Sequence, residues 1–236
     1  MVKPEIICFY CYNFANIIIR DFIFEGSTIN GKKQGKGKLF YPNGKLMFDG
    51  EFYDDKICGN GVMYLDNGGR YEGVFENNLP NGKGKYYDLY AGLRCEGDWV
   101  DGYLLGFGTI YYLDGYKYIG DLKDNRPYGT GKLFFNEVVI YDGEWANGYF
   151  NGYGEYLYNH QEIPLSPVLT LFKVGEKYKG QFKKSYADGK GKLYYSDGKL
   201  MFVGNFIKGC REGFGVLFTE DGKVVKGKYK NDEIID

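Results

Sequence analysis

Residues 141–154, YDGEWANGYFNGYG, contain the pattern that decides the fold of this chain. One aromatic residue lies two positions before Gly143, a second lies two positions after it, and a Gly-x-Gly pair begins nine positions after it. Apolar and polar residues alternate around Gly143, which is typical of a β-strand with one buried face. The segment therefore predicts one strand, a short connection and a second strand that contains the glycine pair.

The pattern recurs along the chain at intervals of 23 or 24 residues, with a single interval of 37. The glycines equivalent to Gly143, called mark glycines below, are Gly26, Gly50, Gly73, Gly97, Gly120, Gly143, Gly180, Gly204 and Gly227. The pairs that follow the first eight are Gly35/Gly37, Gly59/Gly61, Gly82/Gly84, Gly106/Gly108, Gly129/Gly131, Gly152/Gly154, Gly189/Gly191 and Gly213/Gly215. Sequence repeats of this length predict a repeat protein in which each repeat is one hairpin.

Aromatic side chains keep the same register as the glycines. The positions two residues before and two residues after the mark glycine are each aromatic in seven of nine repeats. Glycine weakens a strand, but its missing Cβ leaves a notch in which a neighbouring ring can lie. We therefore expect rings and glycines to pack together. Asn-Gly or Asp-Gly dipeptides predict tight hairpin turns in five repeats, at Gly44, Gly68, Gly115, Gly198 and Gly222.

These repeats resemble the MORN (membrane occupation and recognition nexus) family, whose consensus is similar to Y-x-G-x-W-x-x-G-x-x-x-G-x-G. The resemblance covers about Phe24 to Tyr229, and the first and last repeats depart from it most, as end repeats often do. It implies elongated, single-layered antiparallel sheets that serve as adaptors in cytoskeletal, ciliary or membrane-contact assemblies. Several members of the family dimerise.

The expected fold class is all-β, an elongated single-layer antiparallel β-sheet solenoid of about eight and a half hairpin repeats, roughly 80 Å long at about 4.8 Å per strand. A propeller is the alternative, because two repeats have the length of one four-stranded blade. The predicted domains are an apolar N-terminal cap at 1–23, repeats 1–6 at 24–158, an insertion loop at 159–177, and repeats 7–8 with a partial ninth and a C-terminal cap at 178–236.

The composition excludes several classes of protein. Gly accounts for 37 of 236 residues and aromatic residues for 19%, whereas disordered chains are poor in aromatic residues and collagen needs Gly at every third position. A formal net charge of −1 leaves no excess that would draw the chain onto nucleic acid. The odd number of cysteines, five, favours a reducing compartment, so we expect a cytoplasmic protein.

The N-terminal residues have two further features. Cys8 and Cys11 supply two of the four ligands that structural zinc needs, and His160 lies far away in the sequence, so we expect neither a metal nor a cofactor. The uncharged stretch Ile6–Ile19 has 14 residues, fewer than the roughly 20 of a membrane-spanning helix. We interpret it as a cap on the end of the solenoid, with a targeting or membrane-surface segment as the alternative.

Catalytic motifs are missing from the sequence. It contains one histidine and neither G-x-S-x-G nor H-E-x-x-H, so there is no sign of a nucleophile with its base or of a catalytic zinc site. The Gly-x-Gly pairs do not extend to the longer glycine motifs that bind dinucleotides or phosphates. We therefore predict that the chain is not an enzyme.

Bulky residues on both faces of the sheet predict a contact surface. Neighbouring residues in a strand point to opposite faces, so adjacent pairs such as Tyr86 and Tyr87 put bulk on each side. We expect one face to curl into an aromatic groove that binds a protein, either a helical segment or a second copy of the chain; in the alternative, the rings only cover one another. The predicted groove residues are Tyr71, Phe75, Tyr87, Trp99, Tyr111, Tyr118, Phe134, Tyr141 and Trp145.

Lysine pairs recur beside the glycine pairs of repeats 1, 3 and 7. Their predicted contacts are acidic partners or lipid headgroups, and a solvated rim is the alternative. Residues 1–172 have a net charge of −6 and residues 173–236 of +5, which favours association between opposite ends of two copies. The insertion at 159–177 is interpreted as a surface loop, with a docking element as the alternative. The lysines in question are Lys36, Lys38, Lys83, Lys85, Lys190 and Lys192.

These features together predict a non-enzymatic structural adaptor that presents an aromatic and charged β-sheet groove to other proteins. Cytoskeletal or ciliary (axonemal) machinery is the setting that the resemblance implies. The alternative is a peripheral module that binds anionic phospholipid membranes through the lysine pairs and the apolar N-terminus.

Overall fold

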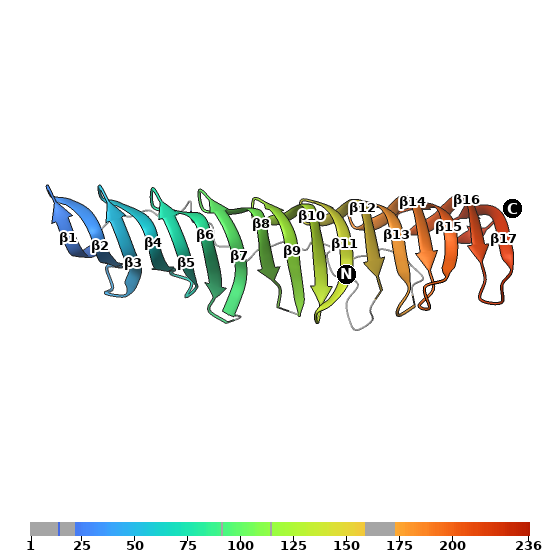
Figure 1. Cartoon of the computed structure of the whole chain (residues 1–236), viewed down its shortest axis with the longest axis horizontal. Helices are drawn as coiled ribbons and strands as arrows, with labels where there is room; N and C mark the ends of the chain where they lie inside the picture. The colour runs from blue at the N-terminus through green and yellow to red at the C-terminus, as the bar shows by residue number, and fades with distance from the viewer. Residues whose placement is uncertain (1–13, 15–21, 91, 114, 159–172) are drawn as a thin grey trace. The chain divides into compact units, whose positions relative to one another are not determined.

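The computed structural model describes residues 14, 22–90, 92–113, 115–158 and 173–236. These residues form eighteen β-strands and no α-helix (Figure 1). The first nine are β1 (Ile23–Ile29), β2 (Lys32–Phe40), β3 (Leu46–Tyr53), β4 (Lys56–Tyr64), β5 (Arg70–Glu76), β6 (Leu79–Asp88), β7 (Gly92–Val100), β8 (Tyr103–Tyr111) and β9 (Tyr116–Lys123). The others are β10 (Arg126–Phe135), β11 (Val138–Ala146), β12 (Tyr149–Leu157), β13 (Lys177–Lys183), β14 (Tyr186–Tyr194), β15 (Leu200–Ile207), β16 (Cys210–Phe218), β17 (Val224–Lys230) and β18 (Glu233–Ile234).

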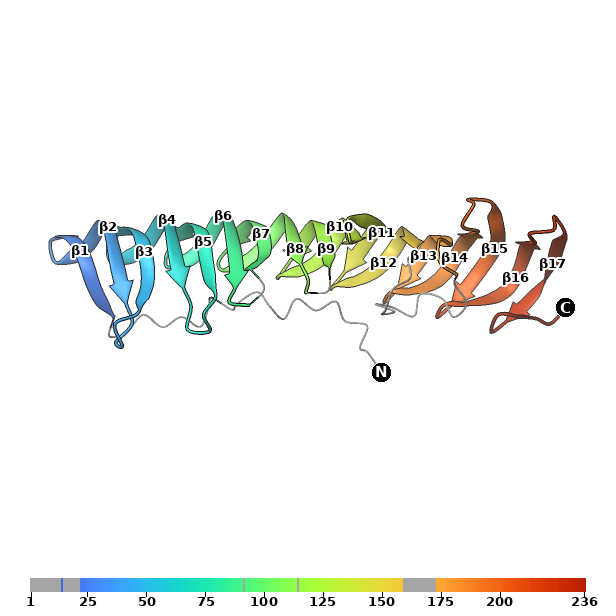
Figure 2. The same ribbon diagram turned by 90° about the horizontal axis from the view of Figure 1, so that it is seen from below.

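The described strands fall into two compact units. The N-terminal unit lies within Cys8–Gly115 and Asp121–Arg126, and the C-terminal unit contains Tyr116–Gly120 and Pro127–Asp236, so β9 contributes to both. Within each unit, successive strands pair antiparallel in chain order, from β1 to β8 and from β10 to β18 (Figure 2). Pairing continues between β4 and β5 and between β12 and β13, where separate four-stranded blades would end. The predicted single-layer sheet of hairpins is confirmed, and the propeller is excluded.

The glycines act as notches for aromatic rings, as predicted. The ring two residues before a mark glycine lies across that glycine and across the second glycine of the following pair; a Cβ on Gly73 would lie 2.7 Å from the Tyr71 hydroxyl, and one on Gly143 would lie 2.8 Å from the Tyr141 hydroxyl. In the repeat where Cys95 takes the ring position, the side chain of Leu104 approaches Gly97 instead. Rings occupy the notch in seven repeats: Phe24, Phe48, Tyr71, Tyr118, Tyr141, Tyr178 and Phe202.

The same rings build the hydrophobic core on one face of each sheet, called the inner face below. Tyr71 meets Phe75 and Trp99 edge to face, each with ring centroids 5.1 Å apart. In the C-terminal unit Tyr178 meets Phe182 and Phe206 in the same way, at 5.0 and 5.1 Å. Such edge-to-face pairs contribute about 0.5–1.5 kcal/mol each beyond the burial of their area. The opposite face of each sheet is called the outer face.

The turns differ from the prediction in their type. Two consecutive residues with positive φ form the tight two-residue turns, as at Asn77 (φ 50°) and Asn78 (φ 70°), which is typical of type I′ hairpins. At the predicted Asn43-Gly44 turn only the glycine has positive φ. There the loop is longer and is closed by a 2.8 Å hydrogen bond from the Tyr41 amide to the Lys45 carbonyl. The predicted Asn43-Gly44 dipeptide therefore marks a longer hairpin end, whereas Asn30-Gly31 and Asn147-Gly148, with positive φ at both residues, form tight two-residue turns.

Phe14 places part of the predicted N-terminal cap against the middle of the N-terminal unit. Its side chain is 1% exposed, and its ring lies 5.5 Å from that of Tyr71 and 5.7 Å from that of Trp99. These two rings belong to repeats 3 and 4, so Phe14 does not cover the first repeat, as a cap would. Cys8, Cys11 and His160 lie outside the described residues. The described residues include no helix long and apolar enough to cross a membrane.

Candidate interaction surface

The structure divides the nine predicted groove residues between the two faces of the sheets. Six of them lie on the inner face and are buried by one another and by neighbouring rings, with at most 3% of their surface exposed: Tyr71, Phe75, Trp99, Tyr118, Tyr141 and Trp145. The indole nitrogen of Trp145 donates a 3.0 Å hydrogen bond to the Gly131 carbonyl, so its polar atom is also satisfied. The predicted groove is therefore wrong for these six: their rings form the core, and a partner cannot contact them.

The other three predicted residues, Tyr87, Tyr111 and Phe134, lie partly exposed on the outer face. The guanidinium of Arg70 lies 4.0 Å from the centre of the Tyr87 ring, and the ammonium of Lys117 lies 5.1 Å from the centre of the Phe134 ring. The Tyr111 hydroxyl donates a 2.9 Å hydrogen bond to the Glu96 carboxylate. Charged side chains therefore lie over the rings of Tyr87 and Phe134 and bind the hydroxyl of Tyr111.

The predicted lysines also fall into two groups. In the N-terminal unit, Lys38 pairs with Asp49 at 3.3 Å, Lys83 with Asp98 at 2.7 Å and Lys85 with Glu96 at 2.9 Å. The hydrogen bond from Lys85 is the main cause that lowers the pKa of Glu96. Within the part of the chain that the structure describes, no acidic group lies within 4.0 Å of Lys36, Lys190 or Lys192.

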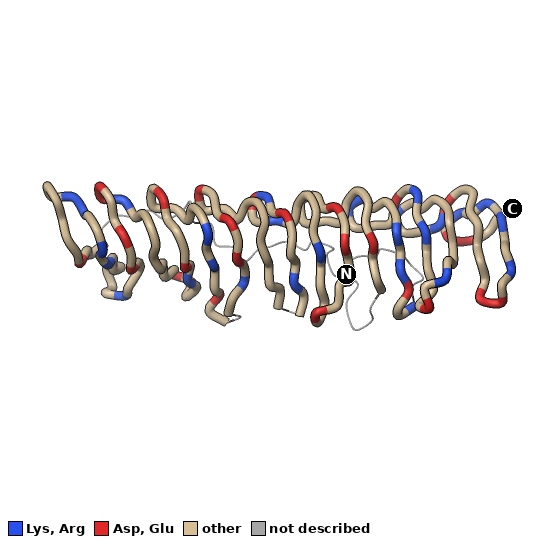
Figure 3. Tube along the Cα trace, in the orientation of Figure 1, with Lys and Arg blue, Asp and Glu red and all other residues tan. Residues whose placement is uncertain are grey.

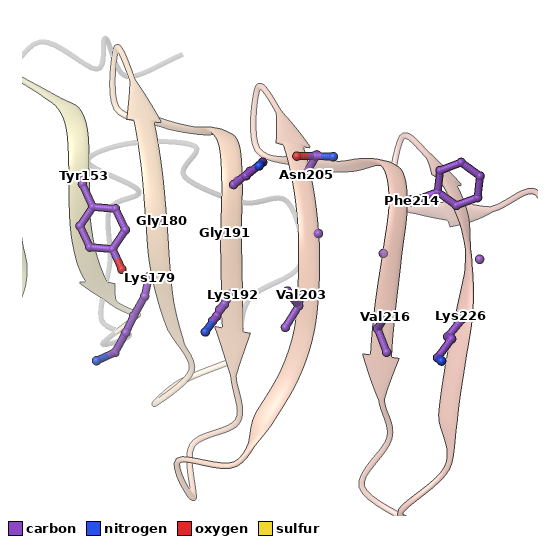
Figure 4. Close-up of a pocket in the computed structure, with 14 residues that line it drawn as sticks. Tyr153, Lys179, Gly180, Gly191, Lys192, Val203, Asn205, Phe214, Val216 and Lys226 are labelled. Carbon is purple, nitrogen blue, oxygen red and sulfur yellow. The ribbon is translucent and has the colours of Figure 1, made fainter.

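A hollow of about 620 Å³ lies on the outer face of the C-terminal unit, around Lys190 and Lys192 (Figure 4). We call it the basic hollow. Two rows of side chains from neighbouring strands flank the hollow. Between the rows, the mark glycines and the glycines of the Gly-x-Gly pairs form its floor. Its lining residues are Tyr153, Lys179, Gly180, Lys190, Gly191, Lys192, Val203, Gly204, Asn205, Phe214, Gly215, Val216, Lys226 and Gly227.

Strand register explains why these side chains come together. Lys179 is directly opposite Lys192, Lys192 is opposite Val203, and Val216 is opposite Lys226. Because Val203 is opposite Val216, these five residues form one continuous row across β13 to β17, as Figure 4 shows. The second row contains Lys190 opposite Asn205.

Two exposed aromatic rings border the basic hollow. Tyr153 on β12 is 56% exposed and Phe214 on β16 is 77% exposed, and they lie at opposite ends of the hollow in Figure 4. Both occupy the middle position of a Gly-x-Gly pair, which points to the outer face because the flanking glycines receive rings on the inner face. Large exposed rings beside a hollow are a feature of interaction surfaces.

The basic hollow carries excess positive charge. Of its four lysines, only Lys179 has an acidic partner among the described residues, Glu155 at 2.7 Å, and this hydrogen bond raises the pKa of Lys179. Like charges at directly opposed positions, such as Lys179 and Lys192, destabilise a sheet. Figure 3 shows basic segments on neighbouring strands in this part of the chain.

An equivalent hollow of about 500 Å³ lies on the outer face of the N-terminal unit. We call it the paired hollow, because Lys83 and Lys85 here are opposite Asp98 and Glu96 and form ion pairs with them. It is lined by Glu72, Gly73, Lys83, Gly84, Lys85, Glu96 and Gly97. The two hollows have the same floor and the same lysine positions, and they differ in the residues opposite the lysines.

The side chains of the basic hollow can bind anionic and apolar groups. The hollow contains ammonium groups, an amide and apolar surface, and no group of three potential metal ligands occurs among the described residues. Sequence reasoning identified Lys190 and Lys192 but missed Lys179, Lys226, Tyr153 and Phe214 as members of the same site. Lys179 and Lys226 each stand directly before a mark glycine, and this position could have identified them from the sequence. Antiparallel pairing places residues at this position in the same row as Lys192.

Comparison with known proteins agrees with the repeat architecture. A family model described as MORN repeat matches residues 24–45, 48–70, 71–88, 95–115, 141–159, 178–199 and 202–224, more than half of the chain. The comparison with curated proteins found no match. One solved structure, described as "Streptogramin B lyase structure", is 11% identical and covers 89% of this chain and 88% of its own, with a TM-score of 0.17. A TM-score this low supports no argument about fold or function.

Proposed function

This chain belongs to the MORN-repeat family, and on that premise we propose that it is a non-enzymatic scaffold that binds other proteins through the outer face of its repeats. A repeat scaffold needs a stable framework and a surface left open for partners. The inner-face rings supply the framework, because they are buried in both units. The surface left for partners is the outer face.

The observation that carries this proposal is the basic hollow with its two exposed rings. Phe214 exposes 77% of its surface and Tyr153 exposes 56%, whereas inner-face rings of the same unit such as Tyr178 are fully buried. Aromatic residues are enriched at protein interfaces, where they supply most of the binding energy. The rigid sheet holds both rings at fixed positions, so little conformational freedom is lost when a partner binds.

The setting that we propose is the cytoplasm, in cytoskeletal or ciliary assemblies, as the family resemblance implies. The rival proposal is a peripheral module for anionic membranes, which the lysines of the basic hollow would also attract. The outer face favours a protein partner because rings and lysines there are arranged around a hollow. A membrane surface is broad, and it contacts projecting groups rather than a recessed floor.

Photo-crosslinking tests the scaffold proposal in the full chain. A benzophenone amino acid replaces Phe214, and a matched variant carries it at Phe107, an exposed ring (61%) between the glycines of an equivalent pair in the N-terminal unit. On irradiation in a cytoplasmic extract, we expect discrete protein adducts from position 214 and few from position 107. No adducts from either position would contradict the scaffold proposal, and equal labelling from both would contradict the basic hollow as the contact site.

Flotation with phosphatidylserine vesicles distinguishes the membrane alternative. The scaffold proposal predicts that the full chain stays with the soluble fraction at physiological ionic strength. A chain that floats with the vesicles, and whose position 214 crosslinks only to lipid, would replace the scaffold with a membrane-binding module.

A further inference from the structure

Building on the proposed scaffold function, we infer that the basic hollow binds an extended acidic segment of a partner protein that also carries apolar side chains. We infer this kind of partner from the charge of the hollow, the register of its strands and its width. Each is set by described residues of the C-terminal unit.

The paired hollow shows which chemical group the lysine positions accept. Lys83 and Lys85 of the N-terminal unit each bind the carboxylate that lies directly opposite, at 2.7 and 2.9 Å. In the basic hollow, the residues opposite Lys190 and Lys192 are Asn205 and Val203, which supply no carboxylate. The basic hollow therefore has lysines at the same backbone positions, but neutral side chains stand opposite them in place of the carboxylates. A second protein can supply carboxylates to these lysines.

The arrangement of the lysines strengthens the attraction to an acidic partner. Lys179 and Lys192 face each other directly across β13 and β14, a placement that costs stability in the free chain. Lys226 lies in the same row beyond the two valines. An acidic segment along this row would relieve the repulsion as it binds, so the binding is charge-assisted and salt-sensitive.

The width of the hollow favours an extended chain over a helix. Its two rows of side chains are two residues apart along each strand, which corresponds to about 6.6 Å. An α-helix with side chains is roughly 10–12 Å across, so a helix would rest on the rims without reaching the floor. The helical partner expected from the sequence is therefore replaced, for this site, by an extended segment.

The length of the hollow fits a short peptide. Its floor consists of glycines paired across five neighbouring strands, from Gly180 to Gly227, which spans about 19 Å at roughly 4.8 Å per strand. An extended chain rises about 3.3 Å per residue, so about six residues fill it. Alternate side chains of such a segment can direct carboxylates to the lysines and apolar groups to Val203, Val216 and the ring of Phe214.

Peptide binding to the full chain tests this inference. The probe is a fluorescein-labelled eight-residue peptide of alternating Glu and Leu with blocked ends, and its control has Gln in place of every Glu. Fluorescence anisotropy should show that the Glu peptide binds at least about tenfold more tightly at low salt than at 0.5 M salt, because exposed charges are screened. The Gln peptide should bind at least roughly tenfold more weakly than the Glu peptide at low salt.

Matched charge variants locate the binding site. The variant Lys190→Gln/Lys192→Gln/Lys226→Gln should weaken binding of the Glu peptide by about tenfold or more. The variant Lys83→Gln/Lys85→Gln, which removes lysines that already have internal partners, should change it less than about twofold. Because all these lysines are exposed, the variants are expected to fold, and circular dichroism checks that they do.

Several outcomes would overturn the inference. Equal binding of the Glu and Gln peptides, or equal effects of the two lysine variants, would contradict it. So would phosphatidylserine vesicles or single-stranded DNA that bind through Lys190, Lys192 and Lys226 while the peptide does not. If protein adducts at position 214 persist but do not depend on these lysines, the scaffold function stands and only the acidic partner is wrong; if the adducts are also missing, both proposals fail.

Discussion

The paired hollow and the basic hollow are built on the same framework but differ in charge. In both, mark and pair glycines form the floor, an inner-face tyrosine lies beneath it, and two lysines flank the pair glycine. Asp98 and Glu96 neutralise the lysines in the N-terminal unit, whereas Asn205 and Val203 leave them without carboxylates in the C-terminal unit. The repeat therefore fixes the framework, while a few outer-face residues determine the charge of each hollow.

The framework beneath the hollows should show the largest effects. Tyr71→Ala and Tyr178→Ala each remove a fully buried ring, and we expect each to lower the free energy of unfolding of its unit by about 3–5 kcal/mol. Tyr71→Ala should cost about 0.5–1.5 kcal/mol more, because only Tyr71 also contacts Phe14. Urea unfolding measures both effects.

The two tryptophans allow each unit to be followed separately. Trp99 belongs to the N-terminal unit and Trp145 to the C-terminal unit, so Trp145→Phe leaves a reporter of the first and Trp99→Phe a reporter of the second. The Phe14 contribution is checked in a Phe14→Ala/Tyr71→Ala variant, whose loss should be smaller than the sum of the single losses. Additive losses, or equal losses for Tyr71→Ala and Tyr178→Ala, would show that Phe14 does not stabilise the N-terminal unit.

Exchanging the residues opposite the lysines should exchange the binding properties of the hollows. Val203→Glu/Asn205→Asp gives the basic hollow the carboxylates of the paired hollow, and we expect it to weaken binding of the Glu peptide about tenfold. Glu96→Val/Asp98→Asn removes the two carboxylates that pair with Lys83 and Lys85, although Glu72 stays opposite Lys85. Added to the Val203→Glu/Asn205→Asp chain, this second pair of substitutions should restore part of the binding. Restoration by the second pair of substitutions would show that the residues opposite the lysines control binding. If neither pair of substitutions changes peptide binding, these residues do not control it.

The framework could be predicted from the sequence far better than the surface. Glycine spacing and aromatic register reveal the hairpins because every repeat packs a bulky side chain, usually an aromatic ring, over its glycines. The same residue types therefore recur at the same positions of each repeat. The prediction failed for Tyr71 and Trp99 as contact residues because spacing alone does not tell which face of a strand becomes the core. Lys179 and Tyr153 were missed because their place in the basic hollow depends on residues from neighbouring strands.

A smaller effect, of opposite sign in the two hollows, is expected for stability. Lys192→Gln removes the repulsion from Lys179, so it should stabilise the C-terminal unit by about 0.2–0.5 kcal/mol. Lys85→Gln removes the ion pair with Glu96, so it should slightly destabilise the N-terminal unit. Urea unfolding of the single-tryptophan chains measures the two changes. If both variants destabilise, Lys192 is not under electrostatic stress in the free chain.

The smallest difference between the hollows should appear in acid. Hydrogen bonds from Lys85 and Tyr111 lower the pKa of Glu96 in the folded chain, so Glu96 binds a proton more readily when the chain is unfolded. Its contribution to stability is therefore complete above the ordinary pKa of a glutamate, about 4.3, and is lost as the pH falls through the lowered value. Val203, at the equivalent position of the basic hollow, does not titrate. We expect Glu96→Gln to flatten the decline in N-terminal unit stability between about pH 5 and pH 3, measured by Trp99 fluorescence, and to leave the C-terminal unit unchanged; an unaltered decline would mean that Glu96 does not stabilise the paired hollow.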